Sequence, residues 1–295
     1  MNIPEIVKQL ISYITNIDFI ICTIGALILG GWLLRTSLGR KALSNSELRR
    51  NNMPLYLPFV LLFIYFSAGS FVILIAEKFF SDRPAWQKAL LDNFVLFASA
   101  ITAIAVIIVL ARVSFAQRLK GFGLNLTTIH KDIPAALLNL LTVYPLMTAM
   151  MLLTMHVSKI IFGPDFEIQP HKELELLSTY PQLSVRVLTI ATAIVIVPVF
   201  EEMLFRGLFQ TAIRSALERV PFSEKMQSKN ARAWLSIIIS SILFISVHAN
   251  PLHWPTLFVL SLGLGYAYEK SGSLFRPIFI HSLFNATSVI AVLYQ

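Results

Sequence analysis

The chain has 295 residues, of which 56% are hydrophobic and only 14% are charged. A soluble domain carries roughly 25% charged residues, and so large an apolar surplus cannot all be buried away from water. We therefore expect an integral membrane protein. The net charge is +8. It does not indicate nucleic-acid binding, because Lys and Arg lie between long apolar runs rather than on one basic face.

Apolar stretches long enough to cross a hydrocarbon core of roughly 30 Å recur along the chain. Continuous apolar runs satisfy their backbone hydrogen bonds in lipid as helices, so the predicted fold is all-α, a polytopic transmembrane helix bundle of about eight spans. The seventh span is short and contains two glycines, which predict a helix that is tilted, broken or packed closely against a neighbour. The predicted spans are Ile17–Leu34, Leu55–Ala76, Asn93–Ala111, Ile133–Val157, Leu183–Phe200 (running on into the next segment), Trp234–Ala249, Thr256–Tyr268 and Leu274–Tyr294.

The distribution of Lys and Arg orients these spans. The segments that follow the first, third and fifth spans are rich in Lys and Arg, whereas the segment after the fourth span is acidic. Because basic loops remain in the cytoplasm, this alternation places the basic loops there and both chain termini on the extracytoplasmic side.

The first polar motif follows the fifth apolar run, where Glu201 and Glu202 stand side by side and Arg206 comes four residues later. On a helix Glu202 and Arg206 share a face and can pair, whereas Glu201 points about 100° away and lacks that partner. This asymmetry suits Glu202 to a structural role and Glu201 to general-base chemistry. A charged helix end with a surface ion pair is the alternative interpretation of this motif alone.

Two further motifs carry histidine. His248 ends the run Phe-Ile-Ser-Val-His in the sixth span, and a single histidine there is more often a packed residue than a functional one. In the last span His281 and Asn285 are four residues apart and project from one helical face. Such a pair can be interhelical hydrogen-bond glue, or it can present two donors to one developing oxyanion.

The three motifs together are far more specific than any one of them. Glu-Glu-x-x-x-Arg, Phe-x-x-x-His and His-x-x-x-Asn occur in this order, with Pro198 before the glutamate pair. This combination resembles the CAAX protease and bacteriocin-processing family of intramembrane proteases, also called the Abi family. The resemblance predicts a protease core over residues 131–295, preceded by N-terminal transmembrane helices over residues 1–130 that carry no recognised motif.

The resemblance implies a metal-free intramembrane endopeptidase without a cofactor, which cleaves membrane-associated or lipidated peptides. By similarity, Glu201 and His248 would activate a water molecule. His281 and Asn285 would form the oxyanion hole, and Glu202 with Arg206 would support the first motif. The expected partners are the lipid bilayer and a peptide or protein substrate, and the expected location is a bacterial inner membrane.

Two alternatives remain open at this point. Zinc could bind to Glu201, His248 and His281, although the chain lacks the His-Glu-x-x-His arrangement of common zinc proteases. A non-catalytic membrane protein, such as a transporter or an immunity or scaffold protein, could use the same buried Glu and His residues for protons or ligands.

The predicted span ends leave one geometric difficulty. If Glu201 lies at the cytoplasmic end of its span, His248 lies roughly 21 Å and His281 about 10 Å into the membrane from the same face. Straight, upright helices would keep these groups apart, so we expect displaced span boundaries or bends at Pro198 or Pro277.

Overall fold

The computed structural model describes residues 17–168, 172–219 and 228–293. These residues form helices joined by short connections, and within them β-pairing is limited to an isolated bridge between Asn51 and Phe115. The predicted all-α class is confirmed. Both chain termini lie outside the described residues, so their expected location remains a prediction.

Each of the eight predicted spans coincides with a helix. The first four correspond to α2 (Ile17–Arg35), α3 (Leu57–Phe80), α4 (Ala85–Ser114) and α6 (Ile129–Phe162). Their outer faces carry large apolar side chains such as Phe63 and Phe79, which are 73% and 76% exposed. Exposed apolar surface of this extent is stable only against lipid, so these helices identify an integral membrane protein.

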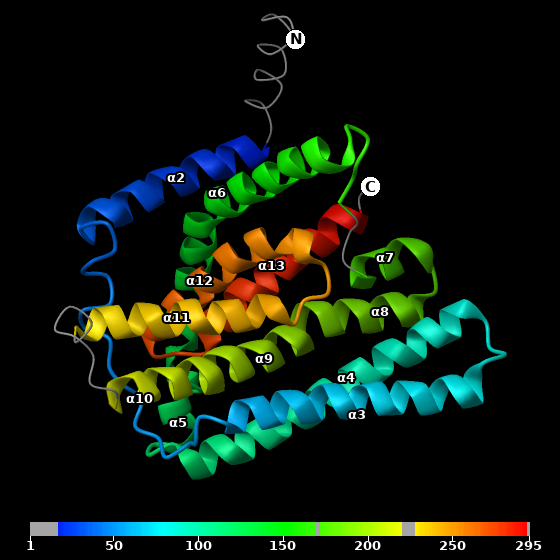
Figure 1. Ribbon diagram of the computed structural model, residues 1–295, viewed down its shortest axis with the longest axis horizontal. Helices are drawn as coiled ribbons and strands as arrows, with labels where there is room; N and C mark the ends of the chain where they lie inside the picture. Colours follow the sequence, from blue (N-terminus) through cyan, green and yellow to red (C-terminus); the bar gives the residue numbers. More distant parts are fainter. Residues whose placement is uncertain (1–16, 169–171, 220–227, 294–295) are drawn as a thin grey trace, which may run out of the picture.

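The fifth span is much longer than the sequence predicts. α8 (Leu183–Ala191), the π-helical segment η2 (Thr192–Ile196), α9 (Val197–Glu202), the π-helical segment η3 (Met203–Gln210) and α10 (Thr211–Arg219) follow one another without a break. Figure 1 shows this central rod crossing the molecule from α8 to α10. The expectation that Glu201 lies at the end of a span that finishes at Phe200 is therefore wrong, because helical structure continues to Arg219 and leaves both glutamates in mid-rod.

The last three spans are α11 (Lys229–Ser246), α12 (Trp254–Ser271) and α13 (Phe275–Leu293). In the described part of the chain, six helical stretches are long and apolar enough to cross a membrane, and α11 and α12 are not among them. Both have 18 residues, and charged residues at one end lower their mean hydropathy: Lys229 and Arg232 at the start of α11, and Glu269 and Lys270 at the end of α12. The predicted close packing of the seventh span is confirmed, since a Cβ at Gly263 would lie 2.7 Å from Val143 of α6.

The helices are arranged around the central rod. α13 packs against η2 and α9, while α11 packs against η3 and α10 (Figure 1). The pair α3 and α4 lies along one side of the rod, and α2 packs on α6 at the opposite side of the molecule. Residues far apart in the sequence therefore meet at the middle of the rod.

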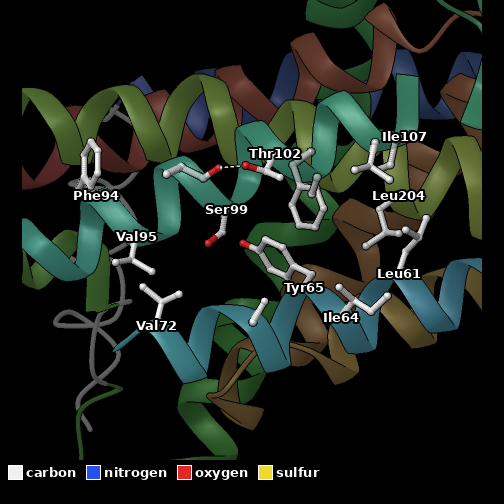
Figure 2. A pocket seen from close by; sticks show the side chains of 15 residues that line it. Leu61, Ile64, Tyr65, Val72, Phe94, Val95, Ser99, Thr102, Ile107 and Leu204 are labelled. Atoms are coloured by element: carbon white, nitrogen blue, oxygen red, sulfur yellow. Dashed lines mark hydrogen bonds between the residues drawn. The ribbon is translucent and has the colours of Figure 1, made fainter. Parts of the chain in front are cut away.

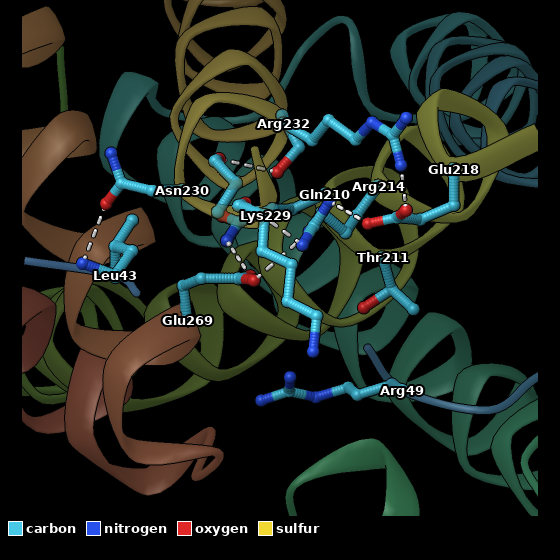
Figure 3. Close-up of polar contacts among 12 residues, drawn as sticks. Leu43, Arg49, Gln210, Thr211, Arg214, Glu218, Lys229, Asn230, Arg232 and Glu269 are labelled. Carbon is cyan, nitrogen blue, oxygen red and sulfur yellow. Dashed lines mark hydrogen bonds and ion pairs between the residues drawn. The ribbon is translucent and has the colours of Figure 1, made fainter. Parts of the chain in front are cut away.

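The basic connections gather at one end of this bundle, as the charge alternation requires. The loop after α2 reaches the start of α11, where the backbone N–H of Leu43 donates to Asn230, and the end of α12, where Arg49 donates to the Tyr268 carbonyl. Figure 3 shows the polar network beneath this loop, in which Glu218 pairs with both Arg214 and Arg232. These contacts fix the ends of α10, α11 and α12 relative to one another.

Gly207, in η3, allows close helix packing directly after the Glu-Glu-x-x-x-Arg motif. A Cβ there would lie 2.3 Å from Cζ of Phe122. Phe122 is the last residue of the short helix α5 (Arg118–Phe122), and its side chain is fully buried. Gly207→Ala is expected to lower the free energy of unfolding by about 1–3 kcal/mol, measured by equilibrium unfolding in detergent.

Gly30→Ala in α2 is the matched control, because no heavy atom lies within 4 Å of a Cβ at that position. Adding Phe122→Leu to Gly207→Ala should recover part of the lost stability if the ring contact is the cause. Equal stability of the Gly207→Ala and Gly30→Ala proteins would contradict this account.

Candidate active site

The two glutamates lie between the π-helical segments η2 and η3. A proline explains why the chain is π-helical in η2. The N–H of Val197 donates to the carbonyl of Thr192, five residues back. The next bond in that register would need an N–H on Pro198 to reach the Ala193 carbonyl, and proline has none. The carbonyl of Ala193 is therefore left to another donor. Segments of π-helix inside α-helices occur frequently at functional sites.

Glu202 and Arg206 form a buried ion pair. The Arg206 Nη1 atom lies 3.1 Å from Glu202 Oε1, and the two side chains are only 1% and 0% exposed. Arg206 also donates to the hydroxyl and carbonyl of Ser261 in α12, at 2.8 and 3.2 Å. The predicted pairing is confirmed, and the additional donors to Ser261 attach the motif to α12.

His281 contacts both glutamates. Its Nδ1 atom lies 2.9 Å from Glu202 Oε1, and its Nε2 atom lies 3.8 Å from Glu201 Oε2. The first distance is a hydrogen bond that fixes the ring, and the second leaves a gap beside the more exposed carboxylate of Glu201. Spacing along the sequence could not reveal these contacts, because they depend on how α13 packs against α9.

Asn285 lies one turn further along α13 and also contacts the central rod. Its side-chain amide donates to the Ala193 carbonyl at 2.8 Å, the carbonyl that Pro198 leaves without a backbone partner. His281 and Asn285 therefore do share one face of α13, as their spacing predicts, and both meet the central rod. In this structure Asn285 forms an interhelical hydrogen bond with one N–H of its side-chain amide. The second N–H of the same amide is not used in that bond.

His248 lies just beyond the end of α11. The helix finishes at Ser246, the His248 Nδ1 atom lies 2.8 Å from the Phe244 carbonyl, and the His248 carbonyl accepts from Trp254 at 2.9 Å. The Phe244 ring lies 4.7 Å from the His248 ring and 5.9 Å from the His281 ring, measured between centroids. Phe244 is thus a common wall between the two histidines.

The depth difficulty is resolved by the length of the fifth helix. Glu201 lies near the middle of the rod rather than at its end, and His248 lies at the far end of α11. The depths inferred from the predicted span ends therefore do not apply, and Phe244 and His281 are the described neighbours of His248 and of Glu201, respectively.

Sequence reasoning missed Tyr65 of α3. Its ring lies 4.3 Å from the ring of Phe200, the residue before Glu201. The only signal in the sequence is a tyrosine inside an otherwise apolar span, and such a residue needs a polar partner.

The donor set does not fit a metal ion. Within the described ranges, no group of three or more His, Cys, Asp or Glu side chains could hold one. Of the candidate zinc ligands Glu201, His248 and His281, Glu201 approaches His281 at 3.8 Å, and the Nδ1 atom of His281 is already bonded to Glu202. We therefore assign no step to a metal.

One family model matches the segment that contains this site. Residues 183–287 match the family described as "Type II CAAX prenyl endopeptidase Rce1-like". The segment that holds the site is Rce1-like. It includes the glutamate pair, Arg206, both histidines and Asn285, so the resemblance that the motifs predict is confirmed.

A relative in Escherichia coli, an "Uncharacterized 24.3 kDa protein", is 32% identical over 98 residues. That similarity covers 32% of this chain and 40% of the relative. No solved structure matches the chain. Because the Rce1-like match begins at residue 183, the expected start of the protease core at residue 131 remains a prediction.

Proposed function

We propose that the chain is an intramembrane endopeptidase that hydrolyses peptide bonds in membrane-associated or lipidated peptides. The observation that carries the proposal is the unequal setting of the two glutamates. Glu202 is fully buried and held by Arg206 and His281, whereas the Glu201 side chain is 16% exposed beside His281 Nε2. One carboxylate is therefore fixed and the other is accessible, as a hydrolytic site requires.

In the proposed reaction Glu201 and His248 hold a water molecule, and Glu201 accepts its proton. The hydroxide adds to the carbonyl carbon of the scissile peptide bond. The proton then passes to the leaving amine as the C–N bond breaks. General acid–base catalysis of this kind contributes about 10²–10⁴-fold to the rate.

The oxyanion of the tetrahedral intermediate would be stabilised by His281 and Asn285. The Glu202 hydrogen bond at Nδ1 orients the imidazole and leaves Nε2 for the substrate. Donation from Nε2 requires that both ring nitrogens carry protons. Asn285 would contribute the N–H that does not bond to Ala193, so its structural and catalytic roles are compatible.

We further propose that the protein resides in a bacterial inner membrane with both termini outside the cytoplasm. The basic loops at one end of the bundle support this orientation. The Rce1-like match supports a peptide attached to or embedded in the membrane as the substrate class.

A cleavage assay tests the function. The purified protein would be incubated in detergent with a quenched fluorescent peptide library that includes lipidated peptides, with and without a strong zinc chelator. Wild type is expected to cleave at the same rate under both conditions, and His248→Ala should reduce cleavage by roughly 10²–10⁴-fold. His156→Ala is the matched control, because His156 is exposed on α6 and should retain full activity.

Loss of cleavage with chelator, restored by zinc, would overturn the metal-free mechanism. A well-folded wild type that cleaves no peptide in the library would favour the non-catalytic alternative.

A further inference from the structure

A cavity opens between α3 and α4, two helices that precede the Rce1-like segment. It has a volume of about 470 Å³, within the range of roughly 300–1,000 Å³ that small-ligand pockets occupy. Its walls are almost entirely apolar side chains of α3 and α4 (Figure 2), and Phe200 and Leu204 of the central rod also line it. The cavity therefore adjoins the rod on both sides of Glu201 in the sequence.

Three hydroxyl-bearing residues interrupt this apolar lining. Thr102 donates to the carbonyl of Ala98 in its own helix at 2.8 Å. Tyr65 and Ser99 face each other across the cavity in Figure 2, and neither hydroxyl has a hydrogen-bond partner among the described residues. A hydroxyl in apolar surroundings is unfavourable without a partner, so these two donors are suited to a ligand acceptor.

The position of Tyr65 connects this cavity to the candidate active site. Its ring packs on the ring of Phe200 at 4.3 Å, and Phe200 is the residue before Glu201. A ligand that accepts a hydrogen bond from Tyr65 would therefore lie beside the segment of the rod that carries Glu201.

We propose that this cavity binds a fatty-acyl chain carried by the substrate peptide, with the acyl carbonyl accepting hydrogen bonds from Tyr65 and Ser99. The inference rests on the proposed peptidase function and specifies its substrate class. The apolar walls fit a hydrocarbon chain. The two hydroxyls fit an oxygen acceptor, which an ester, thioester or amide supplies and a thioether does not.

A bilayer phospholipid offers the same chemistry but does not fit the depth of the site. Tyr65 lies eight residues beyond Leu57, where α3 begins, which is about 12 Å along the helix. Phospholipid carbonyls stay at the edge of the hydrocarbon core, whereas an acylated peptide drawn towards Glu201 would carry its carbonyl inward. We therefore assign the cavity to the acyl chain of a substrate.

A binding experiment tests this proposal without depending on cleavage. The full chain with Glu201→Gln would be titrated with two fluorescent peptides of identical sequence, one with an S-hexadecanoyl cysteine and the other with an S-hexadecyl cysteine. The two probes differ only at the carbonyl. The acylated probe should bind roughly tenfold more tightly, the effect expected for one or two hydrogen bonds.

Variants of the residues that line the cavity test which groups cause the preference for the acylated probe. Tyr65→Phe and Ser99→Ala in the same background should each reduce the preference for the acylated probe, and both together should abolish it. Ala103→Trp, which fills the cavity, should weaken both probes. Thr142→Val on α6 is the matched control, because its hydroxyl bonds to Leu138 in its own helix, and it should retain the full preference. Thermal unfolding would verify that each variant is folded.

Equal affinity for the two probes, or an equal loss for both in Tyr65→Phe, would overturn the proposal. Displacement of the acylated probe by a phospholipid at equal concentration would overturn it in favour of a lipid site. Cleavage by wild type without any preference for acylated peptides would overturn the acyl subsite and leave the peptidase function intact. A preference in binding without cleavage of any peptide would instead contradict the peptidase function alone.

Discussion

Glu201→Gln is expected to abolish peptide cleavage while leaving the protein folded. The substitution keeps the size of the side chain and removes the carboxylate that accepts a proton from water. We expect cleavage to fall by at least 10²–10⁴-fold, with a thermal unfolding temperature close to that of wild type. Initial rates on the best cleaved peptide and a thermal unfolding curve in the same detergent measure both quantities.

Glu202→Gln is the matched comparison at the neighbouring position. Glu202 holds Arg206 and His281 in a fully buried site, so this change should lower both activity and stability. If Glu201→Gln retained activity while Glu202→Gln lost it without a loss of stability, the two roles would have to be exchanged.

Arg206→Leu is expected to have the largest effect on stability. It removes the partner of a fully buried carboxylate, and breaking such a pair typically costs about 3–5 kcal/mol. The contacts with Ser261 and with the Phe244 ring, 4.6 Å from the guanidinium carbon, would be lost as well. The change in the free energy of unfolding would be measured by equilibrium unfolding, in which a denaturing detergent is added to the protein in a mild detergent.

Arg219→Leu provides the control for removal of a positive charge. Arg219 is exposed at the end of α10, and its loss should change stability by no more than about 0.5 kcal/mol. The double variant Glu202→Gln with Arg206→Leu should recover part of the stability, since no uncompensated charge then remains buried. A single Arg206→Leu protein as stable as Arg219→Leu would refute the structural role of the pair.

The predicted spans illustrate what apolar runs reveal and what they conceal. All eight coincide with helices, because a continuous apolar stretch in lipid has no other way to pair its backbone. The end of the fifth span was predicted incorrectly. The basic segment after Phe200 predicts a cytoplasmic connection, yet Arg206, Gln210 and Arg214 are buried in the rod, where α11 and α12 pack against η3.

In the candidate site, too, some contacts could be predicted from the sequence and others could not. Two relations within one helix were predicted from spacing alone: Glu202 pairs with Arg206, and His281 shares a face with Asn285. Helix geometry fixes which side chains stand together four residues apart, so the sequence contains this information.

Contacts between helices were decided only by the tertiary structure. They include the bond from His281 to Glu202 and the approach of Tyr65 to Phe200 beside Glu201. They also include the hydrogen bond that Asn285 donates to the Ala193 carbonyl. Each depends on the rotation and depth at which one helix packs against another, and that packing is the sum of many small contacts distant in the chain. The sequence thus determined the chemical groups and their local pairing, while packing decided which carboxylate is held and which is left accessible to substrate.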